Sequence, residues 1–404
     1  MKIVKTLAAI VGCAVLLAMA GCVASPPPVQ SGTTVGILYT GFGTMPTLMA
    51  SHQIDGYIAW QPFVEIAPMT GFGKVLSYTG ELPPDAVWKN HPCCVLAVRE
   101  DLMAQNPDTV NAVTALMILS TRYVNDHKSE SGAIVADWLT GGANFTYGNI
   151  SVPSTEAMGR AINTVTFTNE PTGEWENGIL KFMAAQRDLG VLKGSLANST
   201  DDASKALIFD TGPYQAAIRM LEGKHIVTPA PETRQLGIGY LMSDHDTALF
   251  VAVKKWQYFN DTYGIALKPR DTSQTRPDLV DLIVNGQKVA EIKLVQGEFG
   301  GPLMQLASTD TIQFVLVGNP PAMASIDKGS PVKILMALNT EGSGVVIAKD
   351  APANDWPSFL QWAKDRSDAG KPLRIASPGK GSIQDILLSY VLKSSGVTVK
   401  EVQV

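Results

Sequence analysis

Five short segments of this chain combine glycine, proline and hydroxyl residues at points where a strand is expected to lead into a helix. Glycine lets a ligand approach the backbone, proline suits the first helical position, and Ser or Thr caps the same end. The free N–H groups and the positive dipole end of such helices favour an anion, each contributing on the order of 0.3–1 kcal/mol. Since the carboxyl-end loops of open α/β sheets converge on one crevice, the pattern predicts an anion-binding cleft, although any single junction is an ordinary turn. The segments are Gly43–Pro46, Gly300–Pro302, Gly318–Pro321, Thr340–Ser343 and Gly379–Ser382.

Nothing in the sequence is typical of an enzyme. It contains no HExxH, no GxSxG and no glycine-rich loop that ends in Gly-Lys followed by Ser or Thr. With 5 His and 4 Cys in the chain, no metal-binding cluster stands out. We therefore expect a binding protein that has no catalytic residues, no cofactor and no metal.

Several single residues have two open interpretations. Trp60 is either a stacking surface for a ligand or part of the core, and His245 is either an anion donor or a structural histidine. Lys380 is either the counter-charge of an oxyanion or a solvated lysine. The neighbours Cys93 and Cys94 are expected to pack in a half-buried loop, because adjacent cysteines rarely form a disulfide.

Three acidic residues also allow two interpretations. Asp244, Glu341 and Glu65 could bind an ammonium group, which would suit a zwitterion such as taurine. They could equally lie at helix ends without a ligand role.

Strands and helices alternate along most of the chain, which indicates α/β lobes with largely parallel sheets. Asn285-Gly286 lies between two runs of β-forming residues, which predicts a hairpin with a type I′ turn. Residues 193–232 are expected to form a polar, weakly structured connector. Other strands are expected at 35–39, 54–59, 74–78, 94–99, 236–241, 332–338, 344–349 and 397–404, and helices at 44–51, 107–127, 174–191 and 247–259.

The N-terminus has the features of an export signal. Lys2 and Lys5 precede the apolar stretch Leu7–Met19, and small residues lead to Cys22. We interpret residues 1–22 as a lipoprotein signal peptide and residues 23–34 as a tether, with Cys22 as the lipidation site. An ordinary cleaved signal with an incidental cysteine is the alternative. Either interpretation predicts an extracytoplasmic protein, periplasmic or at the cell surface, and lipidation would anchor it to the membrane.

The composition fits two compact lobes with hydrophobic cores. Hydrophobic residues make up 45% and charged residues 17% of the 404 residues, and the formal net charge is −5. This charge argues against nucleic acid as a partner, because nucleic-acid binding requires a basic surface.

Several segments together resemble one family of binding proteins. The sequence is similar to the nitrate/sulfonate/bicarbonate (taurine-like) family of ABC-transporter substrate-binding proteins over most of residues 35–200 and 235–404. The similarity rests on LGIGYLMSDHDTALFVA, GEFGGPLMQLAS, FVLVGNPPAMASIDKGSPVKIL, LNTEGSGVVIAKD, ASPGKGSIQDILL and QIDGYIAWQPFVEIA. No single one of these motifs is diagnostic.

The resemblance implies a two-lobed periplasmic-binding-protein type II fold with the ligand between the lobes. It also implies a small anionic or zwitterionic solute, an ABC permease with its cytoplasmic ATPase as partner, and a monomer. By motif position, it implies ligand contacts from Ser243, Asp244, His245, Gly301, Asn319, Thr340, Glu341, Ser343 and Ser382. Trp60, Gln61 and the loop from His91 through Cys93 to Cys94 would approach from the other lobe.

The order of the segments departs from the family pattern. The strand at Leu236, which resembles the start of a mature receptor, follows more than half of the chain, so the fold is expected to be circularly permuted. Residues 35–150 would form one lobe, 151–220 helices returning to the other, 221–234 a linker and 235–404 the other lobe. One of the two crossings between the lobes would be severed, so that the crossing near Asn149–Ser154 would remain. The ligand-free protein would then be more open. A fragment of a tandem pair is the alternative, and residues 268–288 are an insertion of open role.

Three other functions are weighed against this one. Thiamine-pyrimidine synthesis proteins resemble the family, but they carry a cysteine-rich iron motif and act inside the cell. A receptor for an aromatic or pyrimidine solute and a sensor module without a transporter are the other two.

Overall fold

The computed structural model describes residues 32–84 and 86–403. The chain divides into two units, residues 1–32 and 33–404, and the architecture below is that of the second unit. The expected signal peptide, the lipidation site Cys22 and most of the tether lie outside the described residues. Within the described ranges, no helix is both long and apolar enough to cross a membrane.

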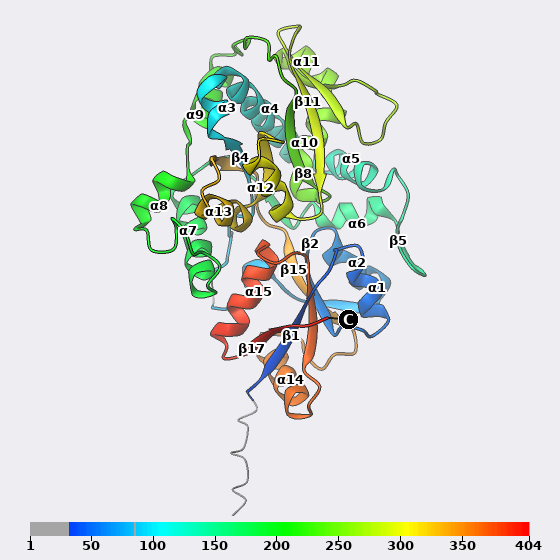
Figure 1. The fold of residues 1–404 in the computed structure, drawn as a ribbon. Coiled ribbons are helices and arrows are strands. Elements are labelled where there is room, and N and C mark those ends of the chain that lie inside the picture. The colour runs from blue at the N-terminus through cyan, green and yellow to red at the C-terminus, as the bar shows by residue number, and fades with distance from the viewer. Residues whose placement is uncertain (1–31, 85, 404) are drawn as a thin grey trace, which may run out of the picture. The chain divides into compact units, whose positions relative to one another are not determined.

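Two mixed β-sheets organise the second unit (Figure 1). The six-stranded sheet, which we call the first sheet, has the order β17-β1-β16-β2-β15-β3, and the seven-stranded second sheet has the order β13-β4-β12-β8-β11-β10-β9. The strands of the first sheet are Thr34–Tyr39 (β1), Gly56–Trp60 (β2), Gly73–Tyr78 (β3), Ser343–Ala348 (β15), Leu373–Ser377 (β16) and Thr398–Glu401 (β17). Those of the second sheet are Cys94–Arg99 (β4), Leu236–Leu241 (β8), Ile265–Pro269 (β9), Leu279–Val284 (β10), Gln287–Gly297 (β11), Phe314–Gly318 (β12) and Val332–Ala337 (β13).

Helices and two small sheets complete the fold. Phe145–Tyr147 (β5) pairs with Ile150–Val152 (β6), and Val165–Phe167 (β7) pairs with Asn339–Glu341 (β14). The α-helices are Met45–Ala50 (α1), Phe63–Thr70 (α2), Glu100–Gln105 (α3), Pro107–Asp126 (α4), Lys128–Thr140 (α5), Ser154–Ala161 (α6), Gly173–Asp188 (α7), Asp201–Ile208 (α8), Gly212–Glu222 (α9), Thr247–Lys254 (α10), Trp256–Tyr263 (α11), Gly300–Ser308 (α12), Asn319–Asp327 (α13), Trp356–Asp368 (α14) and Ile383–Ser394 (α15). Thr79–Glu81 (η1) and Asp244–Asp246 (η2) are 3-10 turns.

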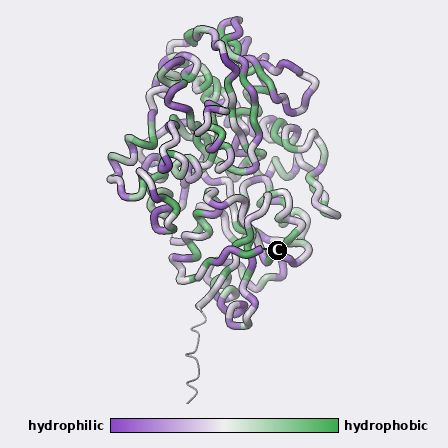
Figure 2. The backbone as a smooth tube through the Cα atoms, in the orientation of Figure 1, coloured by the Kyte–Doolittle hydropathy of each residue, from purple (hydrophilic) through white to green (hydrophobic). Residues whose placement is uncertain are grey.

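The local sequence explains most of these elements. The central strands β4, β8 and β12 are buried at every position, which suits their continuous apolar runs. Asn285 and Gly286 both have positive φ, as a type I′ turn requires, so the expected hairpin is confirmed. Hydrophobic positions follow the strands of both sheets, whereas outer loops are mostly hydrophilic (Figure 2).

The division between the sheets differs from the expected lobes. Residues 35–150 were expected to form one lobe, yet β1–β3 lie in the first sheet and β4 lies in the second. Residues 235–404 also split, because β8–β13 belong to the second sheet and β15–β17 to the first. Sequence order alone did not reveal this, since the strands that pair are far apart along the chain.

The chain crosses between the sheets twice, and the two crossings pair with each other. Residues 79–93 lead from β3 to β4, and residues 338–342 lead from β13 to β15. Cys93 N donates to Asn339 O at 3.0 Å, and Leu338 N donates to Cys94 O at 2.9 Å. Both hinge crossings are therefore intact, which corrects the expectation of a severed hinge and removes the argument for a more open ligand-free state.

Two other segments differ from expectation. Residues 149–154, expected to be the remaining crossing, instead form β6 and the start of α6. The expected connector 193–232 contains the helices α8 and α9. Thr200 caps α8 by accepting a hydrogen bond from Ala203 N, a signal that the polar composition of the segment obscured.

The insertion extends the second sheet. Its residues 268–288 end β9, form β10 and begin β11, all three of which pair in antiparallel order at one edge. Arg270 and Lys288 form ion pairs with Asp281 and Glu291 across these strands.

Candidate functional site

A small cavity lies where loops from the two sheets meet. Its volume is about 20 Å³, which leaves room for roughly one water molecule. Trp60 ends β2 of the first sheet, and Ser382 precedes α15 of the same lobe, whereas Ser243 and His245 follow β8 of the second sheet. The described lining residues are Trp60, Cys93, Cys94, Leu241, Ser243, His245, Gly300, Gly318, Pro321, Ser382, Ile383 and Gln384.

Helix N-termini face this cavity from both lobes. Gly300 begins α12, Gly318 caps α13, and Ser382 caps α15 by accepting a hydrogen bond from Asp385 N at 3.2 Å. The helix dipole gives each of these ends a partial positive charge, and backbone N–H groups can add to it at α12 and α15. At the start of α13, Asn319 N already donates to Cys93 O, and Pro320 and Pro321 have no N–H. No Lys or Arg is among the described residues of the lining.

His245 is the ionisable side chain at the centre of the lining. Its Nδ1 lies 3.4 Å from Cys93 Sγ and 3.6 Å from Cys94 Sγ, and its Nε2 donates to Gly342 O at 3.0 Å. Burial of the ring opposes protonation, but contacts with Cys94, Asp244 and the Gly342 carbonyl outweigh it and raise the His245 pKa to about 9. An imidazolium in this wall would attract an anion.

Two buried carboxyl groups accompany His245. Asp244 is fully buried, neither of its carboxylate oxygens has a hydrogen-bond partner in the described structure, and one of them lies 3.7 Å from His245 Nε2. Burial raises the pKa of Asp244 to about 6 and that of Asp246 to about 7. These carboxyls therefore hold less negative charge near neutral pH than exposed ones, which lessens their repulsion of an anion.

The side chains behind the lining fix its backbone. Asn319 Nδ2 donates to the carbonyls of Pro92 and Cys93, at 2.9 and 3.2 Å. Ser343 Oγ accepts from Gln384 Nε2 at 2.8 Å, which ties the second crossing to α15.

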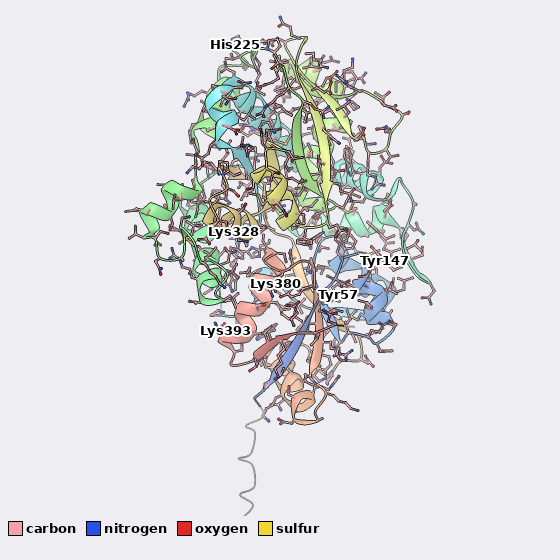
Figure 3. All side chains as sticks on the ribbon, viewed as in Figure 1. Tyr57, Tyr147, His225, Lys328, Lys380 and Lys393 are labelled. Atoms are coloured by element: carbon pink, nitrogen blue, oxygen red, sulfur yellow. The ribbon has the colours of Figure 1, made fainter. Side chains whose placement is uncertain are left out.

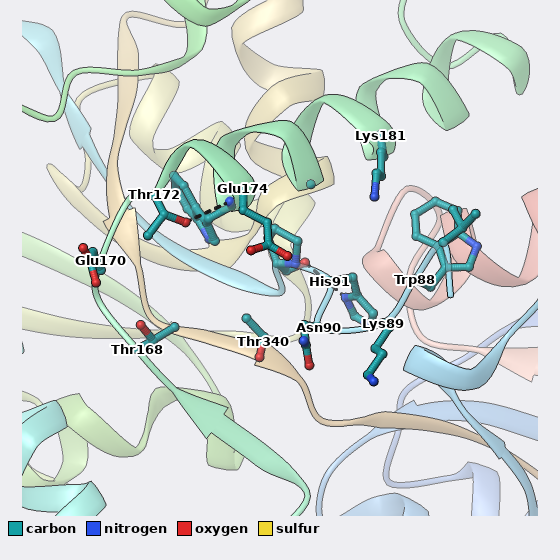
Figure 4. A pocket seen from close by; sticks show the side chains of 14 residues that line it. Trp88, Lys89, Asn90, His91, Thr168, Glu170, Thr172, Glu174, Lys181 and Thr340 are labelled. Atoms are coloured by element: carbon teal, nitrogen blue, oxygen red, sulfur yellow. Dashed lines mark hydrogen bonds between the residues drawn. The ribbon is translucent and has the colours of Figure 1, made fainter. Parts of the chain in front are cut away.

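A larger pocket of about 190 Å³ lies beside the paired crossings (Figure 4). His91, Asn90 and Thr340 come from the crossings, and Glu174 comes from the first turn of α7. The nitrogens of buried His91 contact Thr79 Oγ1 and Pro92 O, and burial lowers its pKa to about 4. This pocket is lined by the crossings, by the segment that leads into α7 and by α7 itself, and none of its lining residues follows β8, β12 or β16.

Comparison with known proteins identifies the family. Residues 22–140 and 229–404 match the NMT1-like family. The chain belongs to this family. The NMT1-like family is part of the nitrate/sulfonate/bicarbonate group of ABC-transporter substrate-binding proteins, which are extracytoplasmic. An uncharacterized protein of Methanocaldococcus jannaschii is 35% identical over 111 residues, which cover 27% of this chain and 74% of that protein. No solved structure matches the chain.

The structure of this NMT1-like protein brings together five of the residues implied by sequence motifs. Trp60, Cys93, Ser243, His245 and Ser382 line the cavity between the sheets. These residues come from four separate segments of the chain: the end of β2, the residue before β4, the turn after β8 and the start of α15.

Other expected site residues lie elsewhere. Gln61 is buried and donates to Glu65 and Thr164, while Glu341 accepts a hydrogen bond from Asn90 N on the outer side of the crossings. The remaining ones lie beside the cavity lining or on the crossings: Asp244, Gly301, Asn319, Thr340, Ser343 and His91. Lys380, which Figure 3 labels, is exposed. Its Nζ forms an ion pair with Glu401.

Seven lining residues were not singled out as ligand contacts from the sequence. Gly300, Gly318 and Pro321 belong to junction motifs that were identified, and Ile383 and Gln384 directly follow such a motif. Cys94 belongs to the loop from His91 to Cys94 that was expected to approach the ligand. Leu241 had no distinguishing signal beyond its place at a strand end.

Proposed function

We propose that this NMT1-like protein is the extracytoplasmic solute-binding lipoprotein of an ABC importer and binds a small oxyanion between its two sheets. The observation that carries the proposal is the convergence of three helix N-termini and His245 on one cavity. Such an arrangement supplies donors and positive charge without lysine or arginine.

The polar wall of the cavity supports a small solute, but the cavity has to widen to admit one. Its volume of about 20 Å³ is far below that of ligand pockets, which is roughly 300–1,000 Å³, so we propose that the loops of the two sheets separate when the solute enters. Ser243, Ser382 and Gln384 add polar side chains to the wall. Sulfonates, including taurine, are the first candidates, followed by nitrate and bicarbonate.

An aromatic solute is the second candidate, because Trp60 lies in the wall. Its indole Nε1 is buried and has no hydrogen-bond partner in the described structure. A pyrimidine or similar ring could either stack on the face of the indole or accept that hydrogen at its edge.

A thermal-shift panel tests the proposal. It should include taurine, alkanesulfonates, nitrate, bicarbonate, carboxylates and thiamine precursors. A ligand at about 100 times its dissociation constant adds roughly 2.7 kcal/mol to the free energy of unfolding, so the melting temperature should rise by several degrees. A rise with an oxyanion supports the proposal, a rise with aromatic solutes alone favours the second candidate, and no rise with any of them contradicts both.

Membrane attachment and the permease partner belong to the same proposal. A lipid at Cys22 would hold the monomeric protein beside the permease, with its cytoplasmic ATPase on the other side of the membrane. Cys22→Ser should release the protein from the membrane fraction. Continued membrane association of this variant would contradict lipid anchoring at Cys22.

The rotated segment order is also part of our proposal. It is supported by the pairing of β1–β4 with strands from residues 314–401, since both halves then build one fold. The permutation can be reversed by placing residues 33–234 after Val404. A flexible linker of about 12 residues between Val404 and residue 33 would span roughly one strand length. We expect that rearranged protein to fold and bind the same solute, and failure to fold would count against permutation.

A further inference from the structure

Three possible metal ligands gather in the wall of the cavity. Cys93 Sγ, Cys94 Sγ and one ring nitrogen of His245 lie within 4.8 Å of one another. All three residues are buried, and both cysteines are free thiols. The histidine is about 150 positions away from the cysteines in sequence, so only the fold brings the group together.

The spacing of these atoms fits a tetrahedral ion. Zn–S bonds of about 2.3 Å and Zn–N bonds of about 2.0–2.1 Å at a tetrahedral angle place sulfur and nitrogen about 3.6 Å apart. The observed separations from His245 Nδ1 are 3.4 Å to Cys93 Sγ and 3.6 Å to Cys94 Sγ. An ion could therefore bind with only small side-chain movements.

The surroundings orient the histidine as a metal ligand. Nε2–H donates to Gly342 O at 3.0 Å, which directs Nδ1 toward the two sulfurs. Metal-ligating histidines usually donate their second N–H to a carbonyl or carboxylate in this way. A Cβ at Gly342 would lie 2.4 Å from Nε2, so the close approach requires glycine.

The Asn339 side chain forms hydrogen bonds with the backbones of both Cys94 and His245. Asn339 Oδ1 accepts from Cys94 N at 2.9 Å, and Asn339 Nδ2 donates to His245 O at 3.2 Å. The backbones that carry the ligands are therefore fixed relative to each other by a fully buried residue of the second crossing.

We propose that Cys93, Cys94 and His245 form a Zn²⁺ site whose fourth position opens into the cavity. Two thiolates and an imidazole are soft and borderline donors, which favour Zn²⁺ over Mg²⁺ or Ca²⁺. Binding displaces the protons of both thiols and any proton on Nδ1 to solvent, and it involves no redox step. Three protein ligands with an open fourth position leave room for water or a solute atom.

This site goes beyond the proposed transport function and does not depend on it. Its test uses metal alone, so the result is independent of which solute, if any, the protein binds.

Cobalt titration of the full, reduced chain is the direct experiment. Co²⁺ should produce thiolate-to-cobalt charge-transfer bands and the strong visible bands of tetrahedral cobalt, saturating at one ion per chain. Zn²⁺ should abolish the bands and raise the melting temperature by several degrees. Folded, reduced protein that gives no thiolate band would overturn the proposal, even if every variant below failed to fold.

Variants then assign the ligands. Cys94→Ser and His245→Gln should weaken Zn²⁺ binding at least tenfold and alter the cobalt spectrum. His127→Gln, which changes an exposed histidine outside the cluster, should leave both unchanged. Wild-type affinity and spectra in both ligand variants would place the metal elsewhere and overturn the assignment.

Discussion

His245 combines several contacts that no other described histidine has. Its two ring nitrogens contact two thiols and a backbone carbonyl, and its own backbone is held by Ser243 and Asn339. The site depends on the close approach of the Gly342 backbone to the His245 ring, because the Gly342 carbonyl reaches Nε2 only where residue 342 has no side chain. Gly342 also has φ of +80°, which favours glycine independently.

Gly342→Ala should therefore lower the free energy of unfolding by more than backbone strain alone would. A residue other than glycine in this conformation costs about 1–2 kcal/mol, and here the new Cβ would also displace the His245 ring. We expect weaker Zn²⁺ binding and weaker solute binding, measured by titration, together with a lower melting temperature.

Gly286→Ala is the matched control for this substitution. Its φ of +78° imposes similar strain, but no atom lies within 4 Å of the added Cβ. It should lower stability without changing either affinity. If both variants bind Zn²⁺ equally well, the contact between Gly342 and His245 has no positioning role.

Ser382→Ala separates a capping role from a ligand role. Loss of the bond from Asp385 N should lower the free energy of unfolding by about 1 kcal/mol. Thr200→Ala removes a similar cap from α8, outside the cavity lining, and should cost about the same. Only Ser382→Ala should also weaken solute binding in calorimetric titration, and equal solute affinity in the two variants would remove Ser382 from the binding site.

At the scale of elements, the paired crossings join the two sheets. Residues 79–93 and 338–342 pair through backbone hydrogen bonds, and Pro92 forms a bridge with Thr340. The lobes also meet where the Phe299 ring lies against the backbone of Gly379. Solute closure would therefore act on two neighbouring strands, as in hinge-bending binding proteins.

Asn339→Ala should weaken this joint. The substitution leaves the buried Cys94 N without its acceptor, which costs about 1–3 kcal/mol of the free energy of unfolding. Asn163→Ala, at an exposed position, should change it by less than about 0.5 kcal/mol. Chemical denaturation of both variants checks this, and equal losses would contradict a structural role for Asn339.

At the scale of the whole molecule, the two halves of the chain interleave. The strands β1–β4 have no neighbour among one another, because each pairs with β12, β13, β15, β16 or β17. The second half has a core of its own, since β12, β8, β11, β10 and β9 are consecutive in their sheet. The two lobes are thus each assembled from both halves.

This interleaving predicts asymmetric behaviour of the halves. Residues 33–234 expressed alone should show no cooperative thermal transition, because their main-sheet strands lack partners. Residues 235–404 should retain partial sheet structure, and mixing the two should restore a cooperative transition by circular dichroism. A cooperative transition of residues 33–234 alone would contradict the observed sheet order.

Local sequence was sufficient for most elements. Apolar runs, Gly and Pro positions and the Asn285-Gly286 turn predicted most strands and helices, since these depend on backbone preferences and burial of neighbouring residues. Helices α8 and α9 were missed because their polar composition resembles a linker. The junction motifs also indicated the correct loops for much of the cavity, because a strand-to-helix turn carries its own signature.

What the sequence by itself determined was therefore most of the elements, the family resemblance and five residues of the cavity wall. Tertiary structure alone decided which strands pair, where the chain crosses between sheets, and that Cys93, Cys94 and His245 meet. The physical reason is that sheet pairing and side-chain clustering join residues separated by hundreds of positions. Their energetics depend on the packing of the complete fold, whereas propensity and periodicity act only over one element.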